Sequence, residues 1–130
     1  EENGQNLKIT DRVEWRQGDY LKAFDEEDIF DGIFSNPPYI PTKDIGGLSR
    51  EVKHEPRLAL DGGTDGLYFY HLLAKGAAEH LKPGGFLAVE FGIGQATDIL
   101  EMFRKSAQYE DFEVIKDYGG IERALYCRKK

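Results

Sequence analysis

The chain has little of what several common classes of protein require. Its 130 residues include one cysteine, Cys127, so no internal disulfide can form, and a reducing compartment such as the cytoplasm is expected. No segment approaches the run of about 18 apolar residues that a membrane helix needs, so no membrane contact is expected. The net charge of −7 argues against a mainly electrostatic grip on nucleic acid. What remains is one globular domain that acts on a protein or a small molecule.

Two familiar site patterns are also incomplete. The three histidines, His54, His71 and His80, do not have the spacing of a metal site, so no metal is expected. Phe91-Gly92-Ile93-Gly94-Gln95-Ala96 carries two of the three glycines of a dinucleotide fingerprint. A tight turn between a strand and a helix is the favoured interpretation of that segment.

Apolar periodicity divides the chain into alternating strands and helices. Strands are predicted over residues 12–17, 29–35, 86–91, 112–117 and 123–127, and helices over residues 67–81 and 95–106. Lys82-Pro83-Gly84-Gly85 is predicted to form a turn after the first helix. Tyr118-Gly119-Gly120 is predicted to join the last two strands as an antiparallel pair. The pattern indicates an α/β fold with a mostly parallel sheet and an antiparallel strand near its end.

The segment Asn36-Pro37-Pro38-Tyr39 is the most informative part of the sequence. Two prolines lack N–H groups, so the strand before them must end there, at the edge where parallel sheets place ligands. The following residues, 40–65, are rich in glycine and proline and are predicted to form a long loop that faces the substrate. By itself, the four-residue segment is equally consistent with a turn that only terminates a strand.

This segment also suits the methylation of a planar NH₂ group. An amide nitrogen is a poor nucleophile, so a catalyst must accept its two hydrogens and orient its lone pair toward the methyl donor. The side-chain carbonyl of Asn36 and the main-chain carbonyl of Pro37 can supply the two acceptors. The aromatic face of Tyr39 can stack on the planar group and tolerates a nearby sulfonium charge. Positioning would do most of the catalytic work.

Residues 30–40 resemble motif IV of amino-group methyltransferases. Further motifs narrow the resemblance: Glu51, His54–Leu60, Asp65–Leu67 with Tyr70, Leu81–Gly85, Glu90–Gly92 with Gln95, and Asp117–Arg123. Together they are similar to the release-factor glutamine methyltransferase family over nearly the whole chain. The resemblance implies a Rossmann-like class I methyltransferase domain that uses S-adenosylmethionine. Its expected reaction is N5-methylation of the glutamine in the Gly-Gly-Gln loop of peptide-chain release factors.

The resemblance also assigns expected site residues. Asn36, Pro37, Pro38 and Tyr39 would hold the glutamine amide, with Asn36, Pro37 and Tyr39 as the catalytic residues. Asn36 would also lie against the methionine end of the cofactor.

A second expected contact lies earlier in the chain. Asp19 and Tyr20 match the position where the family places a cofactor-adjacent side chain, often an aromatic one, by the adenine. For Tyr20, an exposed aromatic residue in a turn is the alternative interpretation.

Part of the family's catalytic domain has no counterpart before Leu7. The missing parts are a helical substrate-recognition domain and the first two strands, with their glycine-rich loop and ribose-binding acid. We therefore expect residues 1–130, as the C-terminal portion of one methyltransferase domain, to bind S-adenosylmethionine weakly or not at all by themselves. The family's strand order, 3-2-1-4-5-7-6, would leave the strand over 29–35 with an exposed edge. Association of two chains through that edge is the favoured expectation, and the alternatives are direct pairing with the strand over 12–17 or completion of the sheet by a preceding segment.

Two other functions remain open on the sequence. A nucleic-acid amino methyltransferase acting on adenine or guanine would use the same four residues, but it would need a basic surface. A catalytically silent module, or a half that works only with a partner chain, would explain the missing glycine loop. In the loop itself, Glu55 and Arg57 are predicted either to form an ion pair that braces it or to contact the substrate.

Overall fold

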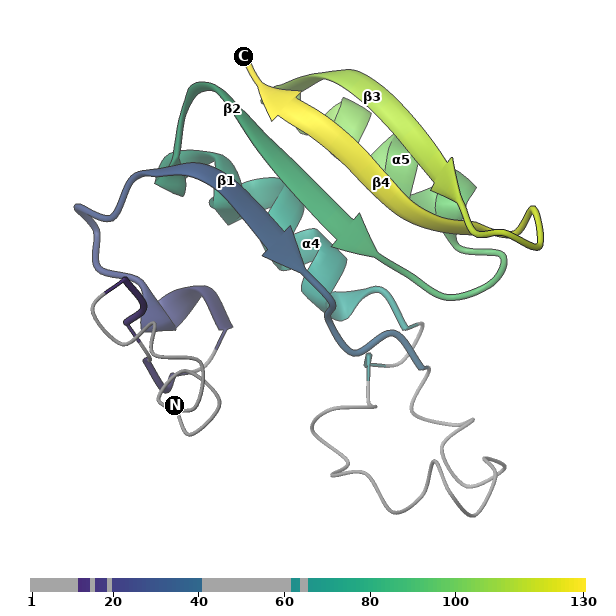
Figure 1. Ribbon diagram of the computed structural model, residues 1–130, viewed down its shortest axis with the longest axis horizontal. Coiled ribbons are helices and arrows are strands. Elements are labelled where there is room, and N and C mark those ends of the chain that lie inside the picture. The colour runs from purple at the N-terminus through teal and green to yellow at the C-terminus, as the bar shows by residue number, and fades with distance from the viewer. Residues whose placement is uncertain (1–11, 15, 19, 41–61, 64–65) are drawn as a thin grey trace.

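The computed structural model describes residues 12–14, 16–18, 20–40, 62–63 and 66–130. Its elements are the 3₁₀ helix η1 (Tyr20–Ala23), strand β1 (Phe30–Ser35), helix α4 (Tyr68–Gly76), the 3₁₀ helix η3 (Ala77–His80), strand β2 (Leu81–Glu90), helix α5 (Ala96–Lys105), and strands β3 (Tyr109–Lys116) and β4 (Glu122–Lys129) (Figure 1). None of the described helices has the length and apolar character needed to cross a membrane.

The described strands form one sheet in the order β1-β2-β4-β3. β1 runs parallel to β2, whereas β4 runs antiparallel to both β2 and β3. The α/β class and the antiparallel hairpin at the C-terminal end are confirmed. The described sheet is mixed, with one parallel and two antiparallel pairings, because β4 lies between β2 and β3.

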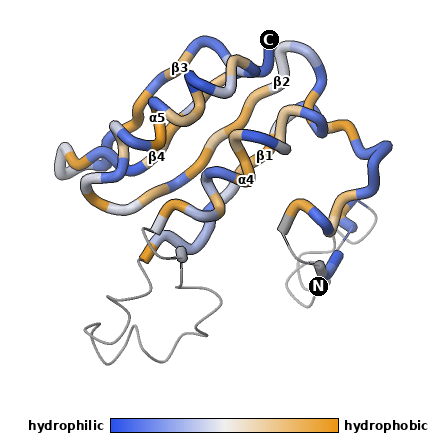
Figure 2. Tube along the Cα trace, turned by 180° about the vertical axis from the view of Figure 1, so that it is seen from behind, coloured by the Kyte–Doolittle hydropathy of each residue, from blue (hydrophilic) through white to orange (hydrophobic). Residues whose placement is uncertain are grey.

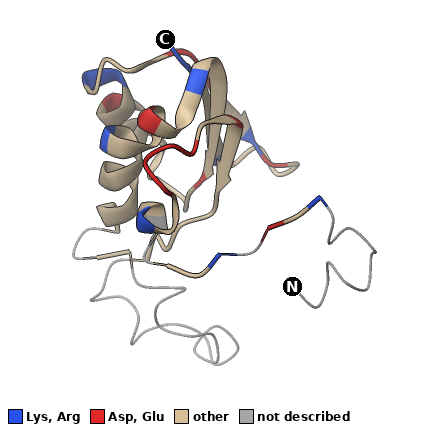
Figure 3. Cartoon of the chain, turned by 90° about the vertical axis from the view of Figure 1, so that its left-hand side faces the viewer, with Lys and Arg blue, Asp and Glu red and all other residues tan. Residues whose placement is uncertain are grey.

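The two α-helices of the described residues cover the same face of the sheet. Figure 3 views the sheet edge-on and shows α4 and α5 together on one side of the strands. The predicted helical spacing is confirmed, since Tyr70 and Leu73 of α4 and Ile99 and Phe103 of α5 are all buried. Figure 2 shows hydrophobic stretches along β2 and alternating hydrophobic and hydrophilic residues along α5, as expected for an amphipathic helix lying on a sheet. The core therefore lies between the two helices and this covered face.

A bulge interrupts the start of β2. Phe30 pairs with Leu81, and Gly32 then pairs with Phe86, so β2 contains extra residues between these two pairings. Gly84, within this insertion, has a φ of +80°, which suits glycine. The turn predicted over residues 82–85 is thus a local loop inside a longer strand, and the strand begins earlier than residue 86.

The strand predicted over residues 12–17 is wrong for the part that the structure describes. Residues 12–14, 16 and 17 have no strand structure, and Arg16 forms ion pairs with Glu14 and Asp28 instead. A strand requires a neighbour for its backbone N–H and C=O groups, and β1 lies at the edge of the sheet without a further described strand beside it. The alternating pattern is therefore not sufficient to form a strand here.

Candidate active site

The ends of two neighbouring strands define the candidate site. β1 and β2 are parallel, and Ser35 at the end of β1 pairs with Val89 near the end of β2. The segment Asn36–Tyr39 leaves the end of β1, and Phe91 and Gly92 leave the end of β2 (Figure 1). Both connections therefore begin at the same edge of the sheet, where α/β proteins bind their ligands.

The predicted catalytic segment changes from exposed to buried along its length. Asn36 is exposed, Pro37 is buried, and Pro38 and Tyr39 are half-buried. The exposed Asn36 lines a hollow of about 490 Å³, which it shares with Ser35 and Glu90 and with apolar residues of the sheet. The side chain that is predicted to meet the reacting amide is thus accessible, while the residues that follow it are anchored.

Two glycines make room for Tyr39. A Cβ atom on Gly92 would lie 2.7 Å from Cδ2 of the Tyr39 ring, and a Cβ atom on Gly62 would lie 2.7 Å from the Tyr39 Cα. Neither distance is tolerated by a real side chain, so the ring and the main chain of Tyr39 require glycine at both positions. The Gly62 N–H also donates to the Ile40 carbonyl over 2.7 Å. Tyr39 is therefore held from two sides.

Gln95 connects the loops around this segment. Its Nε2 donates to the Tyr39 carbonyl at 3.1 Å and to the Gly66 carbonyl at 3.4 Å, while its Oε1 accepts the Gly92 N–H at 2.8 Å. Residues quoted above only as motif matches, Gly66, Gly92 and Gln95, thus meet around Tyr39. Sequence reasoning assigned Gln95 no role, and no local signal connects it with a residue 56 positions away.

The structure describes one of the two residues that are predicted to lie near the adenine. Tyr20 begins η1, and Asp19 lies outside the described residues. The predicted loop interactions of Glu55 and Arg57 lie outside them as well, as do Glu51 and His54. Within the described part of the chain, no three potential metal ligands among His, Cys, Asp and Glu lie together.

The strong electrostatic shifts lie away from the site. The pKa of the Asp117 carboxyl, in the turn between β3 and β4, is lowered. The Ile121 N–H lowers it most, and the Arg123 guanidinium and the Gly119 N–H contribute as well. Burial raises the pKa of Cys127 to about 12 and also raises the pKa of Tyr109. At the site itself, the Tyr70 hydroxyl donates to the Glu90 carbonyl over 2.6 Å, which ties α4 to the end of β2.

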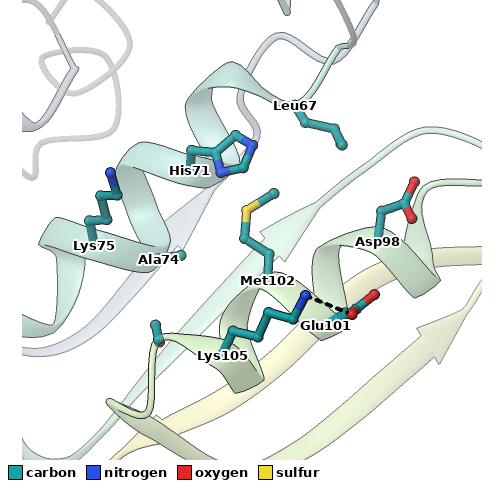
Figure 4. A pocket seen from close by; sticks show the side chains of 9 residues that line it. Leu67, His71, Ala74, Lys75, Asp98, Glu101, Met102 and Lys105 are labelled. Atoms are coloured by element: carbon teal, nitrogen blue, oxygen red, sulfur yellow. Dashed lines mark ion pairs between the residues drawn. The ribbon is translucent and has the colours of Figure 1, made fainter.

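The hollow of about 470 Å³ between α4 and α5 is separate from the candidate site. It is lined by Leu67, His71 and Met102, among others, and by an ion pair of 2.9 Å between Lys105 and Glu101 (Figure 4). None of the predicted site residues lines it. The dinucleotide interpretation of residues 91–96 also gains no support, because the Gly92 N–H is already bonded to Gln95.

The known proteins that resemble the chain over most of its length include two curated relatives and one solved structure. No protein-family model matches it. It is 41% identical over 130 residues to the release factor glutamine methyltransferase of Moorella thermoacetica, covering 100% of the chain and 46% of that relative. It is 53% identical over 97 residues to the release factor glutamine methyltransferase of Geobacter sulfurreducens, covering 74% of the chain and 34% of that relative.

The third is a solved structure, the release-factor-specific protein-(glutamine-N5) methyltransferase of Alicyclobacillus acidocaldarius. It shares 25% identity and a TM-score of 0.51 with the chain, and the match covers 78% of the chain and 50% of that protein. The chain thus spans less than half the length of the two curated relatives, and its described elements have the fold of part of a methyltransferase.

Proposed function

Because the chain belongs to the release factor glutamine methyltransferase family, we propose that the protein carrying it methylates a glutamine side-chain amide in the Gly-Gly-Gln loop of a peptide-chain release factor. The proposed methyl donor is S-adenosylmethionine. The 130 residues would form the C-terminal portion of the catalytic domain, which agrees with their covering 46% of the Moorella relative. This portion would carry the groups that hold the reacting amide.

The observation that carries this proposal is the arrangement of Asn36–Tyr39. The segment leaves the carboxyl end of a parallel strand, with Asn36 exposed and Tyr39 fixed between two glycines. An amide nitrogen needs two acceptors that remain fixed while the methyl group is transferred. An accessible Asn36 next to a buried Pro37 and an anchored Tyr39 is suited to that requirement.

Each residue has a separate role in the proposed reaction. The Asn36 Oδ1 and the Pro37 carbonyl accept the two N–H groups of the glutamine amide, which directs the nitrogen lone pair at the methyl donor. Pro38 restricts the backbone between these acceptors and Tyr39. The Tyr39 ring packs against the planar amide and stabilises nearby positive charge. Methyl transfer then needs no covalent intermediate on the protein.

The described residues fit one end of S-adenosylmethionine. Asn36 offers both an acceptor and an NH₂ donor, so its amide suits the charged amino-acid end of this cofactor. Asp19 and Tyr20 are the proposed neighbours of the adenine. When bound, the cofactor supplies an electrophilic methyl group on its sulfonium.

A labelling experiment tests the proposed function. The gene product that carries these 130 residues is incubated with radiolabelled S-adenosylmethionine and, in parallel, with a release factor, ribosomal RNA and DNA. We expect label only in the release factor, and none when the glutamine of its Gly-Gly-Gln loop is replaced by asparagine. Label in a nucleic acid alone would instead identify a base amino methyltransferase, and label in no substrate would contradict the proposal.

The role of Asn36 is tested in the same assay. Asn36→Ala removes one acceptor aimed at the reacting group and is expected to reduce turnover by about 100-fold to 1,000-fold, with a smaller change in cofactor affinity. Asp98→Asn, an exposed change on α5, is the matched control and should keep full turnover. An Asn36→Ala protein with undiminished turnover would remove Asn36 from the mechanism.

A further inference from the structure

The side-chain hydrogen bonds of Gln95 reach residues outside its own helix, two of them 29 and 56 positions away. It occupies the N-cap position of α5, where a side chain ordinarily accepts a backbone N–H of the first helical turn. No such side-chain hydrogen bond forms at this N-cap. The amide instead bonds to Tyr39 and Gly66, both in the connection between β1 and α4, and to Gly92 in the connection between β2 and α5. Forgoing the cap indicates that these longer contacts are what the side chain provides.

The chemistry of the three partners fixes the orientation of the amide. Tyr39 and Gly66 present carbonyl oxygens, which accept, and Gly92 presents an N–H, which donates. Only an NH₂ group facing the two carbonyls and an oxygen facing the N–H satisfies all three. A primary amide of glutamine length meets this demand, whereas a carboxylate of the same shape cannot donate to either carbonyl.

The position of Tyr39 bears directly on Asn36. Pro37 and Pro38 lie between them, and each proline ring fixes its φ angle, so the four residues form a stiff segment. One end follows Ser35, which pairs with Val89 in the sheet. The other end is the Tyr39 carbonyl, held by Gln95. A shift at Tyr39 would therefore be transmitted along the segment to the Asn36 side chain.

We propose that Gln95 is a positioning residue, which sets the placement of the Asn36–Tyr39 segment by holding the Tyr39 carbonyl and the Gly92 N–H on one amide. This inference rests on the proposed function for its catalytic consequence. Its structural part, that Gln95 keeps the Tyr39 ring on Gly92, does not depend on that function.

The structural part is tested by NMR of the 130-residue chain. The Tyr39 ring lies against Gly92, so its ring current shifts the Gly92 resonances, and Tyr39→Leu gives the reference position without a ring. In Gln95→Glu the Gly92 resonances should move toward that reference. Gln108→Glu is the matched control, because it makes the same chemical change before β3, where the Gln108 carbonyl accepts the Lys130 N–H. Gly92 resonances that stay unchanged in Gln95→Glu overturn the proposal.

The catalytic part is tested by the kinetics of methyl transfer in the gene product. A misplacement of about 1 Å at a reacting group lowers rates on the order of 100-fold, so kcat of Gln95→Glu should fall by about that factor. KM for the methyl donor should change much less than kcat, because Asn36, the displaced residue that is proposed to contact the cofactor, stays in the chain. Gln108→Glu should leave both parameters unchanged.

The two measurements separate the possible failures. Displaced Gly92 resonances with an unchanged kcat overturn the positioning role. Equal losses in kcat for Gln95→Glu and Gln108→Glu overturn it as well, because the effect would then be one of general stability. If the wild type methylates no amide, the proposed function fails, and the resonances still decide whether Gln95 holds Tyr39.

Discussion

Both faces of the sheet carry apolar residues, but they differ in what covers them. On the covered face, Leu87 is 0% and Leu125 1% exposed beneath α4 and α5. On the other face, the rings of Phe34, Phe86 and Tyr126 follow one another across β1, β2 and β4, with centroid separations of 5.1 and 5.9 Å. No helix of the described residues lies over these rings, and Phe34 is 80% exposed. We call this second face the open face.

The difference shows that apolar character and burial have separate causes. Parallel strands are usually apolar on both sides because both faces are covered in the folded protein. The open face retains this composition in β1 and β2, which form the parallel pair. Its hollow also includes Asn36 and Glu90. Any polypeptide that covers the open face would therefore border the candidate site.

The largest expected effect is the loss of a ring from the covered side. Phe103 of α5 is 0% exposed, and its ring centroid lies 5.2 Å from that of Tyr109. Phe103→Ala should lower the free energy of unfolding by about 3 to 5 kcal/mol, measured by urea denaturation. Phe34→Ala on the open face is the matched control and should cost about 1 kcal/mol or less. Equal losses would show that the open face is as well packed as the covered face.

A smaller effect on the free energy of unfolding is expected from removing either of two tyrosine hydroxyls. The Tyr109 hydroxyl is buried and donates to the Leu73 carbonyl over 2.8 Å. Tyr109→Phe removes this hydrogen bond, but the Leu73 carbonyl still accepts the Ala77 N–H, so the change should cost about 0.5 to 1.5 kcal/mol. On the open face, the Tyr126 hydroxyl accepts from the exposed Arg128 Nε, which water can replace. Tyr126→Phe should therefore change the unfolding free energy little, and a loss matching that of Tyr109→Phe would contradict the comparison.

The sequence predicted elements whose signals are local. The period of Tyr70, Leu73 and Ala74 indicated α4, and the turn at Tyr118–Gly120 indicated the hairpin of β3 and β4. Residues 12–17 failed because alternation describes side chains, whereas a strand also needs a partner for its backbone. The bulge in β2 was predicted as a turn because its local signal also says nothing of backbone pairing. Gly84 and Gly85 signal a local bend but not that pairing resumes after it.

The candidate site was also predictable only where its signal is local. The two prolines marked the end of β1, so Asn36–Tyr39 could be assigned to a ligand-binding edge from the sequence. The contacts of Gln95 could not be predicted, because they join residues 29 and 56 positions apart through the fold. The exposure of the open face could not be predicted either, since Phe34 has the same apolar character as the buried Ile33. The roles of Asn36, Pro37 and Tyr39 stay predictions.

The buried thiol of Cys127, on the covered face, is expected to make a smaller and pH-dependent contribution to stability. Burial raises the pKa of Cys127 from 9.0 to about 12. The unfolded chain therefore loses this proton at lower pH than the folded chain, so stability should fall as pH rises from about 9 toward 12. Comparing urea midpoints of wild type and Cys127→Ala at pH 8 and pH 10 isolates this contribution, because the variant lacks the thiol.

An introduced thiol provides the control for the open face. Ala124→Cys in a Cys127→Ala background places a cysteine on the open face of β4. This thiol should react rapidly with iodoacetamide in the native protein, whereas Cys127, which is 1% exposed, should react only as the chain unfolds. Equal reaction rates would mean that the two faces are equally accessible.

The smallest effect on stability is expected from Phe34→Lys, yet this change discriminates between two modes of self-association. At 80% exposure the side chain contributes little packing, so the unfolding free energy should change by less than about 0.5 kcal/mol.

A lysine at position 34 resists burial against a second chain. If two chains associate through the open face, sedimentation of Phe34→Lys should show monomers at concentrations where wild type is dimeric. Thr97→Lys, exposed on α5, adds the same charge and should stay dimeric. Association through the outer edge of β1, which the sequence predicted, uses backbone groups and should survive Phe34→Lys. A wild type that remains monomeric at every concentration would contradict both modes.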